Sequence, residues 1–156
     1  MTVWILDLEA NGLLEDATKI WCVVLVSLDG AHHHWWTHDM IQPLDCFLKM
    51  LIRKGDEIIG HNIIEYDIPL IEKIVKLRLT NCKLIDTLVM SRVNYPDRPG
   101  GHSLENHMKH TENKKVKQDS WLEWDENMLV RCKSDVFATE ELYDKLLLEM
   151  RTNVRS

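Results

Sequence analysis

Residues 3–37 read VWILDLEANGLLEDATKIWCVVLVSLDGAHHHWWT and contain three strand-like patterns separated by turn signals. In a strand over residues 3–10, successive side chains point to opposite faces. One face carries Val3, Ile5, Asp7 and Glu9, and the other carries Trp4, Leu6, Leu8 and Ala10. We therefore expect an apolar strand that displays two acids on one face, and we place it centrally in a sheet.

Two further strands are predicted within the same stretch. Residues 19–28 are almost continuously apolar and rich in β-branched side chains, which is typical of a buried strand. Asp29-Gly30 is a strong hairpin signal, so residues 31–37 are expected to return as the neighbouring antiparallel strand.

The rest of the chain alternates between strand and helix patterns. Strands are expected at residues 56–60 and 83–85, and helices or helical turns at residues 43–53, 67–79, 86–92, 102–110 and 126–150. A hairpin series followed by alternating strands and helices predicts an α/β domain with a mixed central sheet flanked by helices. We expect one domain over residues 1–150 and a C-terminal tail over residues 151–156.

The composition narrows the functional class. The 156 residues are 45% hydrophobic and 28% charged, as in soluble globular domains rather than disordered chains. The net charge of −6 argues against a protein that depends on bulk electrostatic attraction to nucleic acid. It is compatible with an enzyme that collects metal ions with a cluster of acids.

The same features bear on cellular location. No apolar run approaches the roughly 18–20 residues of a membrane helix, and no signal peptide is recognisable, so we expect a cytoplasmic protein. The cysteines form no C-x-x-C pair, which favours buried free thiols over a zinc site. They are Cys22, Cys46, Cys82 and Cys132.

Asp7 and Glu9 are the first candidate site residues. Two acids on the buried face of an apolar strand are costly unless something compensates their charge. Divalent magnesium or manganese ions, which prefer oxygen ligands, are a natural compensation. The alternative is that both acids lie on a solvated face and mark only the end of the strand.

Two more acids have similarly divided interpretations. Asp67 precedes a helix start, where it would act as an N-cap residue, or it lies at the carboxyl end of a strand, where open α/β sheets place their sites. Asp135 lies deep in the last predicted helix among apolar neighbours. Asp135 would belong to the same site as the other acids, or it would be exposed and form an ion pair with Arg131 or Lys133.

These acids belong to a longer series of motifs. The series consists of DLEANGLLE at residues 7–15, HN at 61–62, YDIP at 66–69, DTLVMSR at 86–92, GHSLE at 101–105 and MLVRCKSDV at 128–136. In this order the motifs resemble those of the DEDD exonuclease superfamily, and the nearest resemblance is to the proofreading exonuclease domain of podophage family A DNA polymerases. The resemblance covers nearly the whole chain and implies a ribonuclease-H-like fold.

The resemblance also implies a mechanism. Asp7, Glu9, Asp67 and Asp135 would hold two Mg²⁺ or Mn²⁺ ions, about 3.5–4 Å apart, that hydrolyse a phosphodiester bond. The implied activity removes nucleoside 5′-monophosphates from the 3′ end of DNA, with single-stranded DNA as the expected substrate. A separate polymerase or replication protein is an expected partner. A phage-encoded protein would work in the cytoplasm of an infected bacterial host.

By the same resemblance, several residues would contact the terminal nucleotide. They are Asn11, Leu13, Asn62 and Tyr66. Their structural alternatives are a plain turn for the first two residues, a hydrogen bond at a strand end for Asn62 and a core aromatic position for Tyr66.

One position departs from the family pattern. A tyrosine that orients the attacking water usually lies four residues before the last aspartate, and here that residue is Arg131. A related subgroup has a histidine five residues before it, and here that residue is Val130. Arginine cannot act as a base at neutral pH. It would contact phosphate or the nucleic-acid backbone, or form an ion pair with a neighbouring acid. Because of this departure, an alternative function is a catalytically weakened module that binds nucleic acid or a protein partner. A second alternative is an exoribonuclease, since relatives with this fold also act on RNA.

Two further stretches each allow a structural and a binding interpretation. The basic residues 109–117 would follow a phosphate backbone or form a solvated loop. The run His32-His33-His34 lies in a predicted strand, where alternation divides the side chains between two faces and disfavours a metal cluster.

Overall fold

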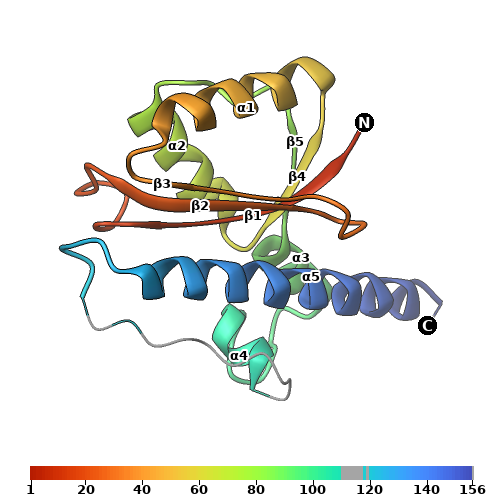
Figure 1. Cartoon of the computed structure of the whole chain (residues 1–156). Coiled ribbons are helices and arrows are strands. Elements are labelled where there is room, and N and C mark those ends of the chain that lie inside the picture. Colours follow the sequence, from red (N-terminus) through yellow and green to blue (C-terminus); the bar gives the residue numbers. More distant parts are fainter. Residues whose placement is uncertain (110–117, 119, 156) are drawn as a thin grey trace.

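The computed structural model describes residues 1–109, 118 and 120–155 and contains one five-stranded mixed sheet (Figure 1). The strands are β1 (Val3–Ala10), β2 (Ile20–Ser27), β3 (His33–Thr37), β4 (Glu57–Gly60) and β5 (Lys83–Asp86). Their order across the sheet is β3-β2-β1-β4-β5. β1 pairs antiparallel with β2 and parallel with β4, so the predicted mixed sheet and the central place of its first strand are confirmed.

Helices cover both faces of this sheet (Figure 1). They are α1 (Ile41–Lys54), a π-helical turn η1 (Ile63–Asp67), α2 (Ile68–Val75), α3 (Thr87–Asn94), α4 (Leu104–Met108) and α5 (Glu126–Arg155). α1 and α2 lie on one face, whereas α5 crosses the other face with α3 and α4 beside it. The α/β architecture therefore agrees with the prediction.

The alternation of side chains along β1 separates two hydrophobic cores. Trp4, Leu6, Leu8 and Ala10 belong to the core beneath α1 and α2. Ile5 belongs to the opposite core, where it packs with Met128, Cys132 and Val136 of α5. Because Asp7 and Glu9 share the face of Ile5, the strand directs both acids toward α5.

Two predicted helix ends are wrong. α2 ends at Val75 instead of residue 79, because Lys76 adopts a left-handed conformation with φ of 60°. α5 continues to Arg155 beyond the predicted end at residue 150. Glu149 of α5 pairs with Arg98 at 2.7 Å, and the side chain of Asn153 donates to the carbonyl of Asn94, which ties the last turns of α5 to the end of α3. The division between a domain and a tail at residue 150 stays a prediction.

The cysteine prediction is confirmed in part. All four cysteines are free thiols, and Cys22, Cys82 and Cys132 are buried. Cys46 is exposed, which corrects the expectation for that residue, because it lies on the outer surface of α1. Across the described residues, no helix combines the length and apolar character that crossing a bilayer requires.

The histidine run behaves as alternation predicts. The rings of His32 and His34 stack with their centroids 6.5 Å apart on the side of Trp4, whereas His33 lies 6.0 Å from Phe137 of α5. Within the described part of the chain, these histidines form no potential metal-binding group. Of the predicted basic stretch, residues 110–117 lie outside the described residues.

Candidate active site

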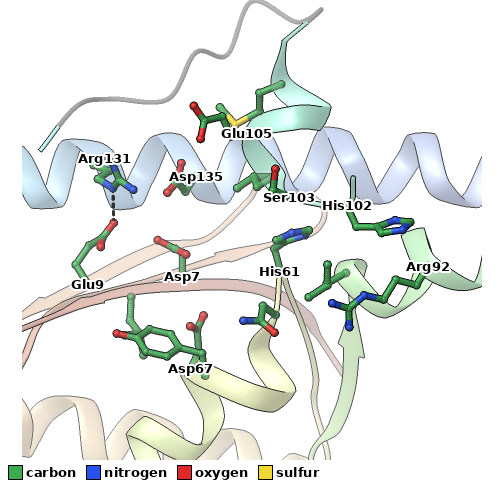
Figure 2. Close-up of a pocket in the computed structure, with 16 residues that line it drawn as sticks. Asp7, Glu9, His61, Asp67, Arg92, His102, Ser103, Glu105, Arg131 and Asp135 are labelled. Carbon is green, nitrogen blue, oxygen red and sulfur yellow. Dashed lines mark hydrogen bonds and ion pairs between the residues drawn. The ribbon is translucent and has the colours of Figure 1, made fainter. Parts of the chain in front are cut away.

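The four predicted acids line one cleft of about 560 Å³ between the sheet, α5 and the α3–α4 segment (Figure 2). Asp7 and Glu9 come from β1, Asp67 ends η1, and Asp135 comes from α5. Carboxylate oxygens of Asp7, Glu9 and Asp135 lie within 4.8 Å of one another. Asp67 lies outside this group of three but is close enough to raise the pKa of Asp7. Segments far apart in the sequence thus bring four carboxylates together.

The acids repel one another in a poorly solvated place. Burial, followed by the charges of Glu9, Asp67 and Asp135, raises the pKa of Asp7 well above its usual value. Burial, followed by the charge of Glu9 and then those of Asp86 and Asp135, raises the pKa of Asp67 in the same direction. Within the residues that the structure describes, Oδ2 of Asp7 and Oδ2 of Asp67 are buried and accept no hydrogen bond. An oxygen-rich set of acids of this kind fits divalent cations such as Mg²⁺ or Mn²⁺.

Packing between β1 and α5 sets the position of Asp135. Cys132, one turn earlier on α5, is buried against the sheet and its thiol donates to the carbonyl of Asp7 at 3.2 Å. Asp135 is consequently turned toward β1, and the residue is only 7% exposed. The alternative of an exposed Asp135 is therefore wrong. The ammonium of Lys133 lies 4.0 Å from the ring centroid of Trp35, on a different part of the helix surface.

A tight connection between β4 and α2 sets the position of Asp67. A Cβ atom on Gly60 would overlap Cγ2 of Ile63, so the chain can turn this closely only at glycine. Asn62 follows with a left-handed φ of 61°. The carboxylate of Asp86 accepts the amide hydrogens of Asn62 at 2.8 Å and Ile64 at 3.2 Å, which satisfies the turn.

The N-cap interpretation of Asp67 is not what its side chain does. Asp67 occupies the position before α2, but it has helical dihedral angles and its carboxylate accepts no capping hydrogen bond among the described residues. It is 4% exposed and faces the cleft (Figure 2). Because Asp67 ends a π-helical turn and does not cap α2, its carboxylate points into the cleft that the other three acids line.

The four predicted nucleotide contacts lie at different distances from the acids. Asn62 and Tyr66 line the main cleft, and Leu13, which is 75% exposed, lines an adjoining cleft of about 300 Å³ together with Tyr66 and Trp121. Asn11 lines neither cleft. Its side-chain oxygen accepts from the amides of Thr18 and Lys19, which agrees with its alternative role in a turn.

Tyr66 links the acids to the loop after β1. Its hydroxyl donates to the carbonyl of Gly12 at 2.7 Å. Burial, followed by the charges of Asp67, Glu9 and Asp7, raises the pKa of Tyr66 to about 12. The hydroxyl therefore stays protonated at neutral pH and serves as a hydrogen-bond donor.

Arg131 contacts one of the four acids directly. Its Nε donates to Oε1 of Glu9 at 3.2 Å (Figure 2). Its guanidinium carbon lies 5.1 Å from the ring centroid of Trp121. The ion-pair interpretation of Arg131 is thus confirmed, and the partner is an acid of the site itself.

The other end of the cleft holds residues to which the sequence alone gave no role. They are His61, Leu88, Arg92, His102, Ser103, Leu104, Glu105 and Met108. His61 is fixed by a contact of 2.8 Å between its Nδ1 and Thr87 Oγ1, and His102 by one of 2.8 Å to Ser91 Oγ. The motifs at residues 86–92 and 101–105 contain most of this wall, so the motif series was the signal that pointed to it.

Known proteins resemble this chain in sequence and in fold. No protein-family model matches the chain. The DNA-directed DNA polymerase of Enterobacteria phage T3 is 40% identical to it over 96 residues, and that of Escherichia phage T7 is 38% identical over 96 residues. Each match covers 56% of this chain, which spans only 13% of the length of either polymerase.

Solved structures share the fold at low sequence identity. Brucella melitensis NrnC superposes with a TM-score of 0.68 at 16% identity, over 99% of this chain and 76% of that chain. Escherichia coli exonuclease I, solved with a dT13 oligonucleotide, gives a TM-score of 0.60 at 13% identity, over 97% of this chain and 42% of that chain. The fold is ribonuclease-H-like. The chain is thus similar in sequence to a part of two phage DNA polymerases, and similar in fold to NrnC and exonuclease I.

Proposed function

We propose that this chain is a metal-dependent 3′–5′ exonuclease that acts on single-stranded DNA. The observation that carries the proposal is the convergence of Asp7, Glu9, Asp67 and Asp135 in one cleft. Among the described residues, Oδ2 of Asp7 and Oδ2 of Asp67 are buried there without a hydrogen-bond donor. Relatives that are DNA polymerases and a structural neighbour with bound oligonucleotide support DNA as the substrate. A separate polymerase or replication protein stays the predicted partner.

The proposed roles follow from where each side chain lies. The four acids would hold two Mg²⁺ or Mn²⁺ ions, which would lower the pKa of an attacking water and stabilise the departing 3′ oxygen. Tyr66 and Asn62 would orient the terminal nucleotide from the wall of the cleft, and Leu13 would offer an apolar contact from the adjoining one. Asn11 would act indirectly, by holding the loop that carries Leu13.

The proposal is tested on a single strand. Purified protein with Mn²⁺ should progressively shorten a 5′-labelled oligodeoxynucleotide from its 3′ end, and EDTA should stop the reaction. Asp7→Ala and Asp67→Asn should each lower the rate by at least about 10²-fold, because each removes a ligand of the metals. No shortening at high enzyme concentration, or full activity in Asp7→Ala, would contradict the proposal.

A matched control distinguishes the loss of a cleft carboxylate from the loss of any negative charge. Glu65 lies two residues before Asp67 in the same π-helical turn, but its side chain is exposed and does not line the cleft. Glu65→Gln should therefore retain nearly the parent rate. An oligoribonucleotide run in parallel would reveal an exoribonuclease, since no residue described above distinguishes ribose from deoxyribose.

One observation favours a second candidate function. The ion pair between Arg131 and Glu9 engages a carboxylate that metal binding needs, as expected of a weakened module that binds nucleic acid or a protein partner. Such a module would retain oligonucleotide in a filter-binding or anisotropy assay, with Mn²⁺ present, and leave it uncut.

A further inference from the structure

We propose that Arg131 is a tethered cation that competes with metal for Glu9 and thereby couples metal loading to phosphate binding. The inference rests on the proposed function, because it concerns the same carboxylates. It assigns to Arg131 a positioning role that differs from the water-orienting tyrosine expected at this place in the sequence. Arg131 would thereby control when the acids bind metal ions.

The ion pair between Arg131 and Glu9 is partly buried, and Arg131 also contacts an aromatic ring. The side chains of Arg131 and Glu9 are 14% and 11% exposed, so the pair is shielded from most solvent. On its other side, the guanidinium lies 5.1 Å from the ring centroid of Trp121. The carbonyl of Trp121 accepts from Nε1 of Trp21 at 2.8 Å, which anchors that segment to β2. Arg131 is therefore held at Glu9 by its surroundings as well as by its charge.

The guanidinium and a divalent ion cannot share Glu9 freely. Glu9 belongs to the group of three acids whose oxygens lie within 4.8 Å of one another. A cation bound by these acids would lie close to a guanidinium that carries only donors and a permanent positive charge. Each cation consequently lowers the affinity of the other for Glu9, and this coupling is reciprocal.

A phosphate group relieves the competition. Arg131 lines the cleft that contains all four acids, so an anion entering the cleft meets its guanidinium. The planar fork of arginine matches phosphate oxygens, and contacts of this kind replace the Nε contact to Glu9. Phosphate then draws Arg131 away from Glu9, and the carboxylate becomes available to the metal. Metal and nucleotide should therefore bind cooperatively.

The test is a calorimetric titration of the whole chain with Mn²⁺. Arg131→Gln should bind Mn²⁺ about tenfold more tightly than the parent, within the roughly 5–150-fold range typical of coupled sites. Thymidine 5′-monophosphate should tighten Mn²⁺ binding in the parent by a larger factor than in Arg131→Gln. Arg131→Met, which keeps an apolar stem, serves as a second variant if the glutamine variant misfolds.

Arg92 provides the matched control. It lines the far side of the same cleft, away from Glu9 (Figure 2), so Arg92→Gln removes the same charge and leaves the ion pair intact. Its Mn²⁺ affinity should change less than about twofold, because the lost charge is distant and screened by solvent. In the parent, ¹H–¹⁵N spectra should show a slowly exchanging Nε–H of Arg131 that shifts or exchanges faster on addition of Mg²⁺.

Three results would overturn the inference. The first is unchanged or weaker Mn²⁺ binding in both Arg131 variants. The second is equal tightening in Arg92→Gln, which would indicate general electrostatics. The third is the absence of Mn²⁺ binding in every variant, which would also remove the proposed metal site. Parent protein that binds Mn²⁺ but does not shorten DNA contradicts the proposed catalysis alone, and the titration still decides the role of Arg131.

Discussion

At the scale of single residues, Asp7 shows how a functional group can oppose stability. Its carboxyl lies on an apolar strand, faces three other acids, and has one buried oxygen without a hydrogen-bond donor among the described residues. Ionising this group without a bound cation costs free energy. The residue that the proposed chemistry needs is therefore a residue that destabilises the metal-free protein.

Replacing Asp7 by asparagine should stabilise the metal-free protein. Because the folded state raises the pKa of Asp7, it retains a proton that the unfolded state has already lost once the pH exceeds the usual value of 3.8. The parent thus loses stability as the pH rises from 3.8 to the folded pKa. Asp7→Asn, which has no such ionisation, should be more stable by about 1–2 kcal/mol at pH 7.

Urea unfolding in EDTA at a series of pH values measures this difference. The advantage of Asp7→Asn should grow from about pH 4 upward, just above the usual value of 3.8, and then level off. Asp45→Asn, a change in a surface pair on α1, should give little difference at any pH, since exposed ion pairs contribute about 0–1 kcal/mol. An advantage that shrinks with rising pH would contradict the assigned direction of the pKa shift.

Sequence reasoning at this scale identified the acids but not all of their neighbours. The two-residue period of a strand directs Asp7 and Glu9 to one face wherever the strand lies, so their pairing was predictable. For Arg131, helical spacing suggested Asp135 as a local partner, four residues away. The structure also pairs Arg131 with Glu9, 122 residues away in the sequence. Only the packing of α5 on the sheet creates this contact, and that packing is not a local property.

At the scale of elements, the connection from β4 to α2 shows why one acid was harder to place. The sequence predicted a single helix starting at Asp67, whereas η1 precedes α2 and ends at that residue. Its first amides are satisfied by Asp86, at the end of a different strand. A π-helical turn that depends on a distant carboxylate leaves no periodic signal of its own.

Gly60→Ala should disrupt this connection. The added Cβ would overlap Cγ2 of Ile63 and lie 3.1 Å from the carbonyl of Leu6, so η1 must shift. We expect a loss of about 1–3 kcal/mol in the free energy of unfolding. Mn²⁺ affinity should also fall, because η1 carries Asp67.

Gly12→Ala is the control for this prediction. Gly12 lies in the loop after β1, and a Cβ there would meet its nearest atoms at 3.7 Å, an ordinary contact. Thermal denaturation and Mn²⁺ titration of both variants should show a clear effect at Gly60 only. Equal effects would mean that the close approach of Gly60 to Ile63 does not control the turn.

At the scale of the whole molecule, the site joins segments that the sheet otherwise keeps apart. β1 supplies two acids, η1 supplies a third from the end of β4, and α5 supplies the fourth from across the face of the sheet. The topology and the layers were predictable from hydrophobic periods and turn signals. The full length of α5 was not, because its last turns are held by Arg98 and Asn94 from other parts of the chain.

A bound metal should therefore act as a cross-link for the whole fold. Mn²⁺ at about 100 times its dissociation constant should raise the free energy of unfolding by about 2.7 kcal/mol. Hydrogen exchange should slow in β1, η1 and the middle of α5 together. EDTA should reverse both effects, and Asp7→Ala should not respond. Protection confined to one segment would contradict a site shared by all three.

The crossing of α5 over β1 also governs when the site can exist during protein synthesis. Asp7 lies on β1, which is synthesised before α5, the helix that carries Asp135. A nascent or prematurely terminated chain can pair its strands, but it cannot assemble the full set of acids. The proposed metal site can consequently form only after translation has produced α5.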